Sequence, residues 1–181
     1  YEGLDSIIDS DKLNEELIKI RRALYFDLGV PFPGIQLRYN DRLPTESYQI
    51  VLSEVPVAQG RLRHDWILVA EPEQTLRSLN IKYEKDKPFL PGIETLWAPR
   101  SMADLLSKAG LNFKRPSQIV SFHLASILRR HSSEFIGVQE TKFLLSAMEQ
   151  RFPDLVKEAL RVMPTQKIGE VFQRLVAGRC A

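Results

Sequence analysis

Cysteine is nearly absent from this chain of 181 residues, which contains only Cys180. No disulfide can therefore form within the chain, and this fits a reducing compartment. Long apolar runs are also missing: none approaches the roughly 20 residues of a membrane span, and residues 1–20 lack a signal-peptide core. Because the chain starts on Tyr1, we expect it to be part of a longer protein, whose other segments need not be soluble.

A strong excess of one charge is also lacking. The 25 basic and 23 acidic residues give a formal net charge of +2, which by itself indicates neither a nucleic-acid nor a membrane-surface partner. With 44% hydrophobic and 27% charged residues, the composition is that of a globular domain and not of a disordered tail.

Motifs of catalysis and cofactor binding are missing as well. The sequence contains no G-x-S-x-G elbow, no Walker A motif and no G-x-G-x-x-G motif. The histidines His64, His123 and His131 lack the i,i+4 spacing that places two metal ligands on one helix face. Carboxylates such as Glu140 are typical of solvated helix surfaces. We therefore predict no catalytic residue, no metal site and no cofactor.

The first third of the chain combines a helix with short strands. Apolar residues at helical spacing predict a helix over about 10–28, with Gly29 as its C-terminal stop. Alternating patterns predict strands over 35–40, 48–52 and 55–62. The last two are separated only by Ser53-Glu54, which predicts a β-hairpin whose second strand lies at a sheet edge because of Pro56.

The middle of the chain has a different character. Short strands are predicted over 66–70 and 94–98, and a short helix over 101–109 ends at Gly110. Turn-rich sequence here also holds Phe89, Leu90, Trp97 and Phe113. Aromatics beside prolines are suited to holding a partner peptide or helix, but a small subdomain equally needs them for its own core. The sequence leaves these two interpretations open.

The remainder is predicted to be helical, with Ser117 and Thr165 as N-caps and Pro153 at a helix start. Gly137 separates two of these helices, and Gln139 and Glu140 then fall in the first turn of the second, where an acidic side chain suits the exposed amides. Mixed elements followed by helices predict an α+β fold. The expected buried stripes are Val120, Leu124, Ile127, Leu128 and Phe135; Thr141, Leu144, Leu145, Met148 and Phe152; and Ile168, Val171, Phe172, Leu175 and Val176.

Several stretches, in order along the chain, resemble one protein family. They are "IRRALYFDLGVPFPGIQLRYNDRLPTESYQIVL", "VAQGRL", "KPFLPGIETLW", "IVSFHLASILRRHSSEFIGVQETKFLL" and "VFQRLVAGR". Together they resemble the cytoplasmic domain of the bacterial type III secretion export gate, which includes FlhA of the flagellum and the SctV and InvA group of virulence injectisomes. The wording of "PFPGI" and "VQETKFLL" favours the injectisome branch.

The resemblance implies an architecture of small subdomains. Residues 1–66 plus 116–135 match the first α/β subdomain, 67–115 an inserted small α/β subdomain, and 136–181 the helical third subdomain, and a fourth family subdomain has no counterpart in this sequence. It also implies a non-enzymatic role as a nine-membered ring at the cytoplasmic face of the inner membrane. That ring docks export chaperones with bound substrates, and it contacts the gatekeeper and other export-apparatus proteins.

The resemblance further implies a docking site in a cleft between subdomains. The matching positions are Asp86 and Phe89 ahead of Trp97, with Phe122 before His123. Phe122 departs from the pattern of the flagellar members, where a threonine precedes the histidine, so the chaperone preference is expected to differ. Gly137 is the expected hinge between subdomains.

Two other classes of function remain as alternatives, beside the flagellar branch of the same family. An enzyme of unknown type would use groups such as His123 or Glu140. An RNA-binding module would need an aromatic pair for base stacking, and only Tyr39 and Tyr48 come near that pattern.

Overall fold

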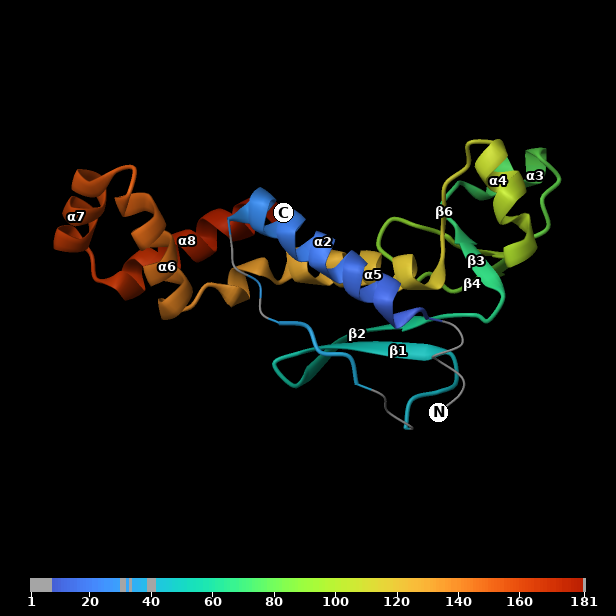
Figure 1. Ribbon diagram of the computed structural model, residues 1–181, viewed down its shortest axis with the longest axis horizontal. Helices are drawn as coiled ribbons and strands as arrows, with labels where there is room; N and C mark the ends of the chain where they lie inside the picture. Colours follow the sequence, from blue (N-terminus) through green and yellow to red (C-terminus); the bar gives the residue numbers. More distant parts are fainter. Residues whose placement is uncertain (1–7, 30–31, 33, 39–41, 181) are drawn as a thin grey trace. The chain divides into compact units, whose positions relative to one another are not determined.

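The computed structural model describes residues 8–29, 32, 34–38 and 42–180, and the chain forms two compact units (Figure 1). Unit 1 consists of Tyr1–Ile18 and Leu37–Ser126, and unit 2 of Lys19–Gln36 and Ile127–Ala181. Helices and small antiparallel sheets occur together, which confirms the α+β prediction. The finer division into three subdomains stays a prediction. None of the described helices combines the length and apolar character of a membrane span.

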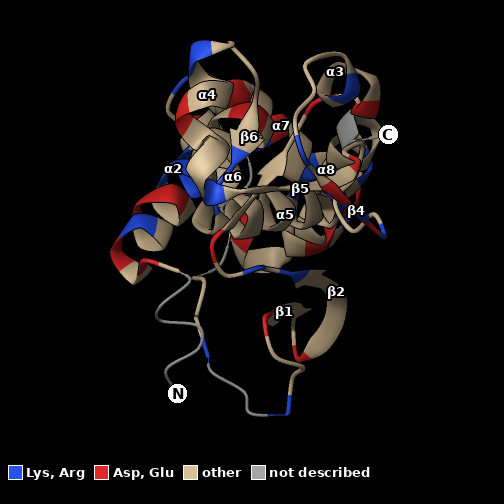
Figure 2. Cartoon of the chain, turned by 90° about the vertical axis from the view of Figure 1, so that its right-hand side faces the viewer, with Lys and Arg blue, Asp and Glu red and all other residues tan. Residues whose placement is uncertain are grey.

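The first described helix, α2 (Ser10–Leu28), has the predicted bounds. Its N-terminus is capped by Asp9, whose Oδ1 accepts hydrogen bonds from the backbone N–H groups of Asp11 and Lys12. Its C-terminus ends at Gly29, which has a left-handed φ of 68° that favours glycine. Charges of both signs follow one another along the helix surface (Figure 2), while its leucines are buried.

Strands β1 (Ser47–Leu52) and β2 (Val55–Arg61) form the predicted antiparallel hairpin. Tyr48 and Ile50 are buried and their neighbours Gln49 and Val51 are exposed, as the alternation predicts. The register shifts between Ile50 and Val51, so Pro56 lies beside an irregularity of a two-stranded sheet, where its missing N–H costs little.

The third strand predicted near the hairpin is not observed where the structure describes it. Residues 35–38 have no regular secondary structure, and positions 39 and 40 lie outside the described residues. An alternating pattern can form a strand only if a neighbouring strand satisfies its backbone groups. In the described residues, the hairpin sheet has β1 and β2 as its members.

The second sheet of unit 1 has the strand order β4-β5-β3-β6, with every neighbouring pair antiparallel. Its strands β3 and β5 confirm two predictions, whereas β4, β6 and the helix α3 were not individually predicted from the sequence. The bounds in this sheet and its helices are β3 (Trp66–Val69), α3 (Glu73–Ser78), β4 (Glu84–Asp86), β5 (Thr95–Pro99), α4 (Ala103–Lys108) and β6 (Phe113–Lys114).

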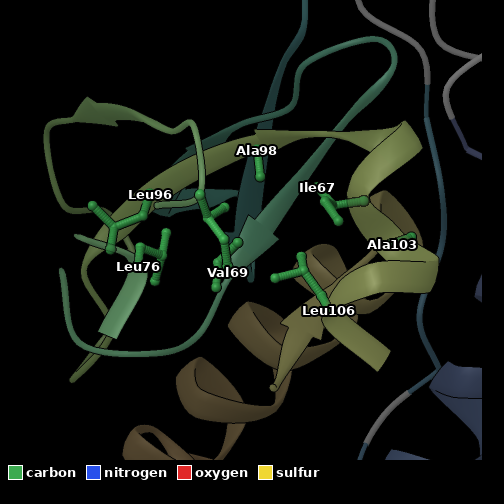
Figure 3. Close-up of a cluster of buried hydrophobic side chains, with 8 residues drawn as sticks. Ile67, Val69, Leu76, Leu96, Ala98, Ala103 and Leu106 are labelled. Atoms are coloured by element: carbon green, nitrogen blue, oxygen red, sulfur yellow. The ribbon is translucent and has the colours of Figure 1, made fainter. Parts of the chain in front are cut away.

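One face of this sheet is covered by α3 and α4. Figure 3 shows Ile67, Val69 and Leu96 of the strands facing Leu76 of α3 and Leu106 of α4. These side chains are buried, so this face is the hydrophobic core of the sheet subdomain. The helix start at 101 is a 3-10 turn, Arg100–Met102, that continues into α4, and Gly110 ends it with a φ of 70° as predicted.

Helix α5 (Pro116–Arg130) begins two residues earlier than predicted. Pro116 is already helical, so the residue before it, Arg115, takes the capping position, and the prediction of Ser117 as the N-cap is wrong. The Oε1 atom of Gln118 accepts a hydrogen bond from the Arg115 N–H at 2.9 Å, which is one half of a capping box. Phe135 lies beyond α5, in a 3-10 turn, Ser132–Phe135.

Unit 2 ends in three helices, α6 (Val138–Glu149), α7 (Pro153–Val162) and α8 (Thr165–Cys180). Pro153 starts α7 as predicted. Thr165 is the first helical residue of α8, and the carbonyl of Pro164 accepts the first helical hydrogen bonds, so the prediction that Thr165 caps the helix is wrong by one position.

Fewer apolar side chains of these helices are buried than the sequence predicted. Leu145, Val156 and Ile168 form its buried cluster, with Ala159 and Phe172 packed against it. Val171 and Leu175, which were expected to be buried, are 42% and 62% exposed. From α8 only Ile168 and Phe172 belong to this cluster, because a helix buries its contact line rather than every apolar side chain on that side. Other members of the predicted stripes, Leu144, Met148 and Phe152, are also at least partly exposed.

Candidate functional site

The ring of Phe89 contacts three other rings of unit 1. It stacks on Trp97 with centroids 6.4 Å apart and an interplanar angle of 21°. It also meets Tyr48 edge-on at 6.5 Å and His123 at 6.0 Å. Trp97, Tyr48 and His123 are buried, and Phe89 is half-buried. We call Tyr48, Phe89, Trp97 and His123 the aromatic cluster.

The sheet positions Trp97 within this cluster. Glu84, Trp97, Leu68 and Lys114 are register partners in one row across β4, β5, β3 and β6. Residues paired in this way point to the same face, and this is the face opposite the one that α3 and α4 cover. Trp97 is therefore available to pack on side chains that do not belong to the core of the sheet.

The other three rings come from separate elements. Tyr48 lies on β1, His123 lies on α5, and Phe89 lies in the segment between β4 and β5, which has no regular secondary structure. The Nε1–H group of Trp97 is buried without a hydrogen-bond partner in the described part of the chain. Packing of the rings, not a polar contact, therefore holds Trp97 in place.

Gly60 has no side chain, and this leaves room for the ring of Tyr48. It is the register partner of Tyr48 across the hairpin, and a Cβ atom at Gly60 would lie 2.2 Å from Cζ of the Tyr48 ring. Since no real Cβ approaches an atom so closely, any other residue at position 60 would force the Tyr48 ring to move.

Tyr48 and His123 share a buried hydrogen bond of 2.9 Å between Oη and Nδ1. Burial raises the pKa of the Tyr48 hydroxyl and lowers the pKa of the His123 imidazole. At neutral pH the hydroxyl is therefore protonated and the imidazole is neutral, and the tautomer of the imidazole sets which of the two groups donates the hydrogen bond.

The structure brings together only some of the predicted docking residues. Phe89 and Trp97 are in contact, as described above. Asp86 points to the same sheet face as Trp97, since it pairs with Thr95 of β5, and it forms an ion pair of 3.3 Å with Arg61. The ring of Phe122 lies under Lys114 Nζ at 4.5 Å from the ring centroid. Within the described residues no ring contact or hydrogen bond joins Asp86 or Phe122 to Phe89.

Tyr48 and His123 were not predicted to belong to this site. The sequence suggested Tyr48 only as a possible base-stacking residue and His123 only as a possible catalytic group, and nothing local relates two residues 75 positions apart.

Cations lie close to the aromatic rings of this face. The guanidinium of Arg63 is 5.1 Å from the Trp66 ring centroid and 5.9 Å from that of Trp97, and Arg63 also pairs with Glu84. Such cation–π contacts favour a positive rim around the rings. Among the residues that the structure describes, no group of three or more His, Cys, Asp or Glu side chains is arranged as metal ligands.

Gly137, the expected hinge, is the N-cap of α6. Its φ of −96° and ψ of −165° are extended values that other residues also adopt. Glu140 Oε2 accepts a hydrogen bond from the Gly137 N–H at 3.0 Å, and the Thr141 hydroxyl donates to the Gly137 carbonyl at 2.7 Å. Glu140 therefore has the helix-terminal role that the sequence predicted. The hinge role of Gly137 stays a prediction.

Comparison with known proteins places the chain in a family. A model of the FHIPEP family matches residues 2–181. The chain belongs to the FHIPEP family. Among FHIPEP relatives, it is 44% identical over 169 residues to Low calcium response locus protein D of Yersinia pestis, covering 93% of this chain and 24% of the relative. It is 34% identical over 178 residues to Secretion system apparatus protein SsaV of Salmonella typhimurium, covering 97% of this chain and 25% of SsaV.

Solved structures have the same fold. The CdsV protein of Chlamydia pneumoniae matches with a TM-score of 0.82 and 34% identity over 91% of this chain and 49% of CdsV. A structure of CdsV in complex with CdsO matches with a TM-score of 0.83. The chain spans about a quarter of the length of the curated FHIPEP relatives it matches.

Proposed function

We propose that this chain is part of the cytoplasmic docking platform of a type III protein export gate. In this role it binds chaperone–substrate complexes and passes the substrates to the membrane pore. The observation that carries the proposal is the membership of residues 2–181 in the FHIPEP family, whose relatives include a secretion system apparatus protein. The relationship to SsaV supports the injectisome branch, and the flagellar branch is the alternative.

The aromatic cluster supports a docking site on unit 1. Phe89 is half-buried, so part of its ring is open to a partner, and Trp97 supports the ring from behind. An aromatic side chain held in this way offers a large apolar surface and loses little conformational entropy on binding. The proposed site consists of Asp86, Phe89, Trp97 and Phe122, with Arg61 and Lys114 at their polar edges.

The partners follow from the same role. They are export chaperones with bound substrates, a gatekeeper protein and other proteins of the export apparatus. A complex such as that of CdsV with CdsO is one example of the contacts expected of this chain. In the whole protein the domain would form a homo-oligomeric ring at the cytoplasmic face of the inner membrane.

Binding without catalysis is the function that these side chains support best. His123 is 4% exposed and engaged with Tyr48, and Glu140 caps a helix, so neither is placed to act on a substrate. An RNA-binding role is also less well supported, because the face of Tyr48 is buried in the aromatic cluster. Tyr39, its expected partner for base stacking, lies outside the described residues.

The test of this function is the affinity for a chaperone–substrate complex of the same secretion system, measured by isothermal titration calorimetry. Phe89→Ala should weaken binding by at least about tenfold, because truncation of an aromatic anchor costs roughly 2 kcal/mol or more. Leu105→Ala is the matched control, since Leu105 is an exposed apolar residue of α4 on the other side of the sheet. An affinity that is the same for wild type and Phe89→Ala, with the near-ultraviolet spectrum intact, rejects the docking site.

A further inference from the structure

The orientation of Phe89 is not fixed by its own backbone. Residues 87–94 join β4 to β5 and contain no helix or strand. A side chain in such a segment has the rotamer freedom of a loop residue unless tertiary contacts remove it. For Phe89 those contacts are the three rings of Trp97, Tyr48 and His123.

Tyr48 and His123 form two sides of the space that holds the Phe89 ring. Tyr48 meets His123 edge-on with centroids 5.8 Å apart, and the hydrogen bond between Oη and Nδ1 ties the two side chains to each other. Gly60 supplies the room that Tyr48 needs to reach His123. The pair therefore forms a rigid wall, built from β1 and α5, against a residue whose own segment is irregular.

We propose that Tyr48 and His123 are positioning residues, whose mutual hydrogen bond holds Phe89 stacked on Trp97 in the orientation that a docking partner requires. This inference rests on the proposed function, because it concerns the same site. It adds Tyr48 and His123, which contact the ring of Phe89 and which the partner need not touch.

The physical effect is preorganisation. A ring that is already held in its bound orientation loses little freedom when the partner docks, whereas a mobile ring must be ordered at that moment. Removing the Tyr48 hydroxyl leaves Nδ1 of a buried imidazole without a partner, so the imidazole reorients and the wall loosens. Replacing the His123 imidazole leaves the buried Tyr48 hydroxyl without its partner in the same way. Neither change alters the Phe89 side chain itself.

The first experiment observes Phe89 without any partner. 4-Fluorophenylalanine is incorporated at position 89 of the full chain, and its fluorine resonance is recorded for wild type, Tyr48→Phe and His123→Phe. We expect one sharp resonance displaced by the Trp97 ring in wild type. In both variants it should move towards the value of an unfolded chain and broaden. An unchanged resonance in either variant overturns the proposal. Tyr83→Phe is the matched control, since Tyr83 also loses a bonded hydroxyl but packs in the α3–α4 core.

The second experiment is a double-mutant cycle on affinity for the chaperone–substrate complex. Tyr48→Phe alone should weaken binding by about threefold to tenfold, which is the cost of ordering one side chain. In the Phe89→Ala background, Tyr48→Phe should change the affinity by less than about twofold, because it acts through Phe89. Equal effects of Tyr48→Phe in both backgrounds would mean a general structural role and overturn the proposal.

The two experiments test the docking function and the positioning role separately. If Phe89→Ala leaves the affinity unchanged, the docking function fails, and the fluorine resonances still decide whether Tyr48 and His123 hold the ring. If Phe89→Ala weakens binding but Tyr48→Phe and His123→Phe do not, the docking function stands and the positioning role is wrong.

Discussion

The carboxylate of Glu73 in unit 1 accepts hydrogen bonds from three side chains. Its Oε1 accepts hydrogen bonds from Arg77 at 2.6 Å and from the Tyr83 hydroxyl at 2.7 Å, and its Oε2 accepts one from Lys85 at 2.6 Å. The Lys85 ammonium, followed by Tyr83 and Arg77, lowers the pKa of Glu73 from 4.5 to about 2. One side chain thus links α3 to β4 and the segment before it.

This carboxylate gives the first prediction, which concerns pH. Because its pKa is lowered on folding, Glu73 stabilises the fold above its ordinary pKa, and this contribution is lost as the pH falls from about 4.5 towards 2. In Glu73→Gln the thermal midpoint should therefore fall less steeply over this range than in wild type. Thermal melts followed by circular dichroism at several pH values measure the difference. Glu149→Gln, on the exposed surface of α6, should keep the wild-type slope; equal slopes in all three proteins contradict the prediction.

At the scale of the element, α6 and α8 of unit 2 approach each other at a glycine. A Cβ atom at Gly169 would lie 2.8 Å from Oγ1 of Thr141, which is fully buried. The hydroxyl of Thr141 is in turn held by the Gly137 carbonyl. The helix start at Gly137 and the helix crossing at Gly169 therefore meet at one buried threonine.

Replacing either of two glycines of α8 with alanine should change the stability of unit 2, in opposite directions. Gly169→Ala should destabilise unit 2 by about 1–3 kcal/mol, because the added methyl group forces Thr141 aside. Gly178→Ala meets no atom within 4 Å, so it should stabilise α8 by about 0.5 kcal/mol through the higher helix propensity of alanine. Urea unfolding followed by circular dichroism measures both; a loss of stability no larger for Gly169→Ala than for Gly178→Ala contradicts the close contact.

The hairpin turn of β1 and β2 has backbone angles that its residues do not favour. Ser53 and Glu54 have φ values of 48° and 67°, which are the left-handed values of a type I′ turn. Asn-Gly is the preferred pair for this turn, so the double variant Ser53→Asn, Glu54→Gly should stabilise unit 1 by about 0.5–1 kcal/mol. Denaturant unfolding followed by tryptophan fluorescence measures the gain. The reverse result, a loss of stability, would show that the turn differs from the one described.

At the scale of the whole molecule, each unit has a hydrophobic core of its own. The cluster around Leu96 and Leu106 belongs to unit 1, and the cluster of Leu145, Val156 and Ile168 belongs to unit 2. Both tryptophans of the chain, Trp66 and Trp97, lie in unit 1. Tryptophan fluorescence therefore reports on one unit, and circular dichroism reports on both.

This distribution makes a core mutation in unit 2 informative. Leu145→Ala should cost unit 2 about 2–5 kcal/mol, because it removes buried methyl groups and leaves a cavity. The helical signal should then lose part of its amplitude at lower urea concentration, while the tryptophan transition stays where it is in wild type. Leu175→Ala is the matched control, since Leu175 is largely exposed in α8. A tryptophan transition that moves together with the helical signal in Leu145→Ala contradicts independent cores.

Local structure was predictable from the sequence wherever a residue restricts its own backbone. Gly29 and Gly110 end helices in left-handed conformations, Pro153 starts α7, and the Ser53-Glu54 spacing predicted the hairpin. Phe89 and Trp97 were singled out as aromatics of turn-rich sequence and by the family resemblance, but their contact was found only in the fold. The N-cap of α5 was misplaced by two residues and that of α8 by one, because the residue before a proline or threonine can take the capping position equally well.

The sequence by itself determined the α+β order of elements, the helix and strand stops, and the absence of disulfides, because these depend on residues close together in the chain. Tertiary structure alone decided which apolar stripes are buried and which rings meet. Tyr48 and His123 lie 75 positions apart, and only the folding of β1 against α5 brings them to Phe89. A hydrogen bond at that separation depends on how the elements pack, and no local sequence pattern predicts it.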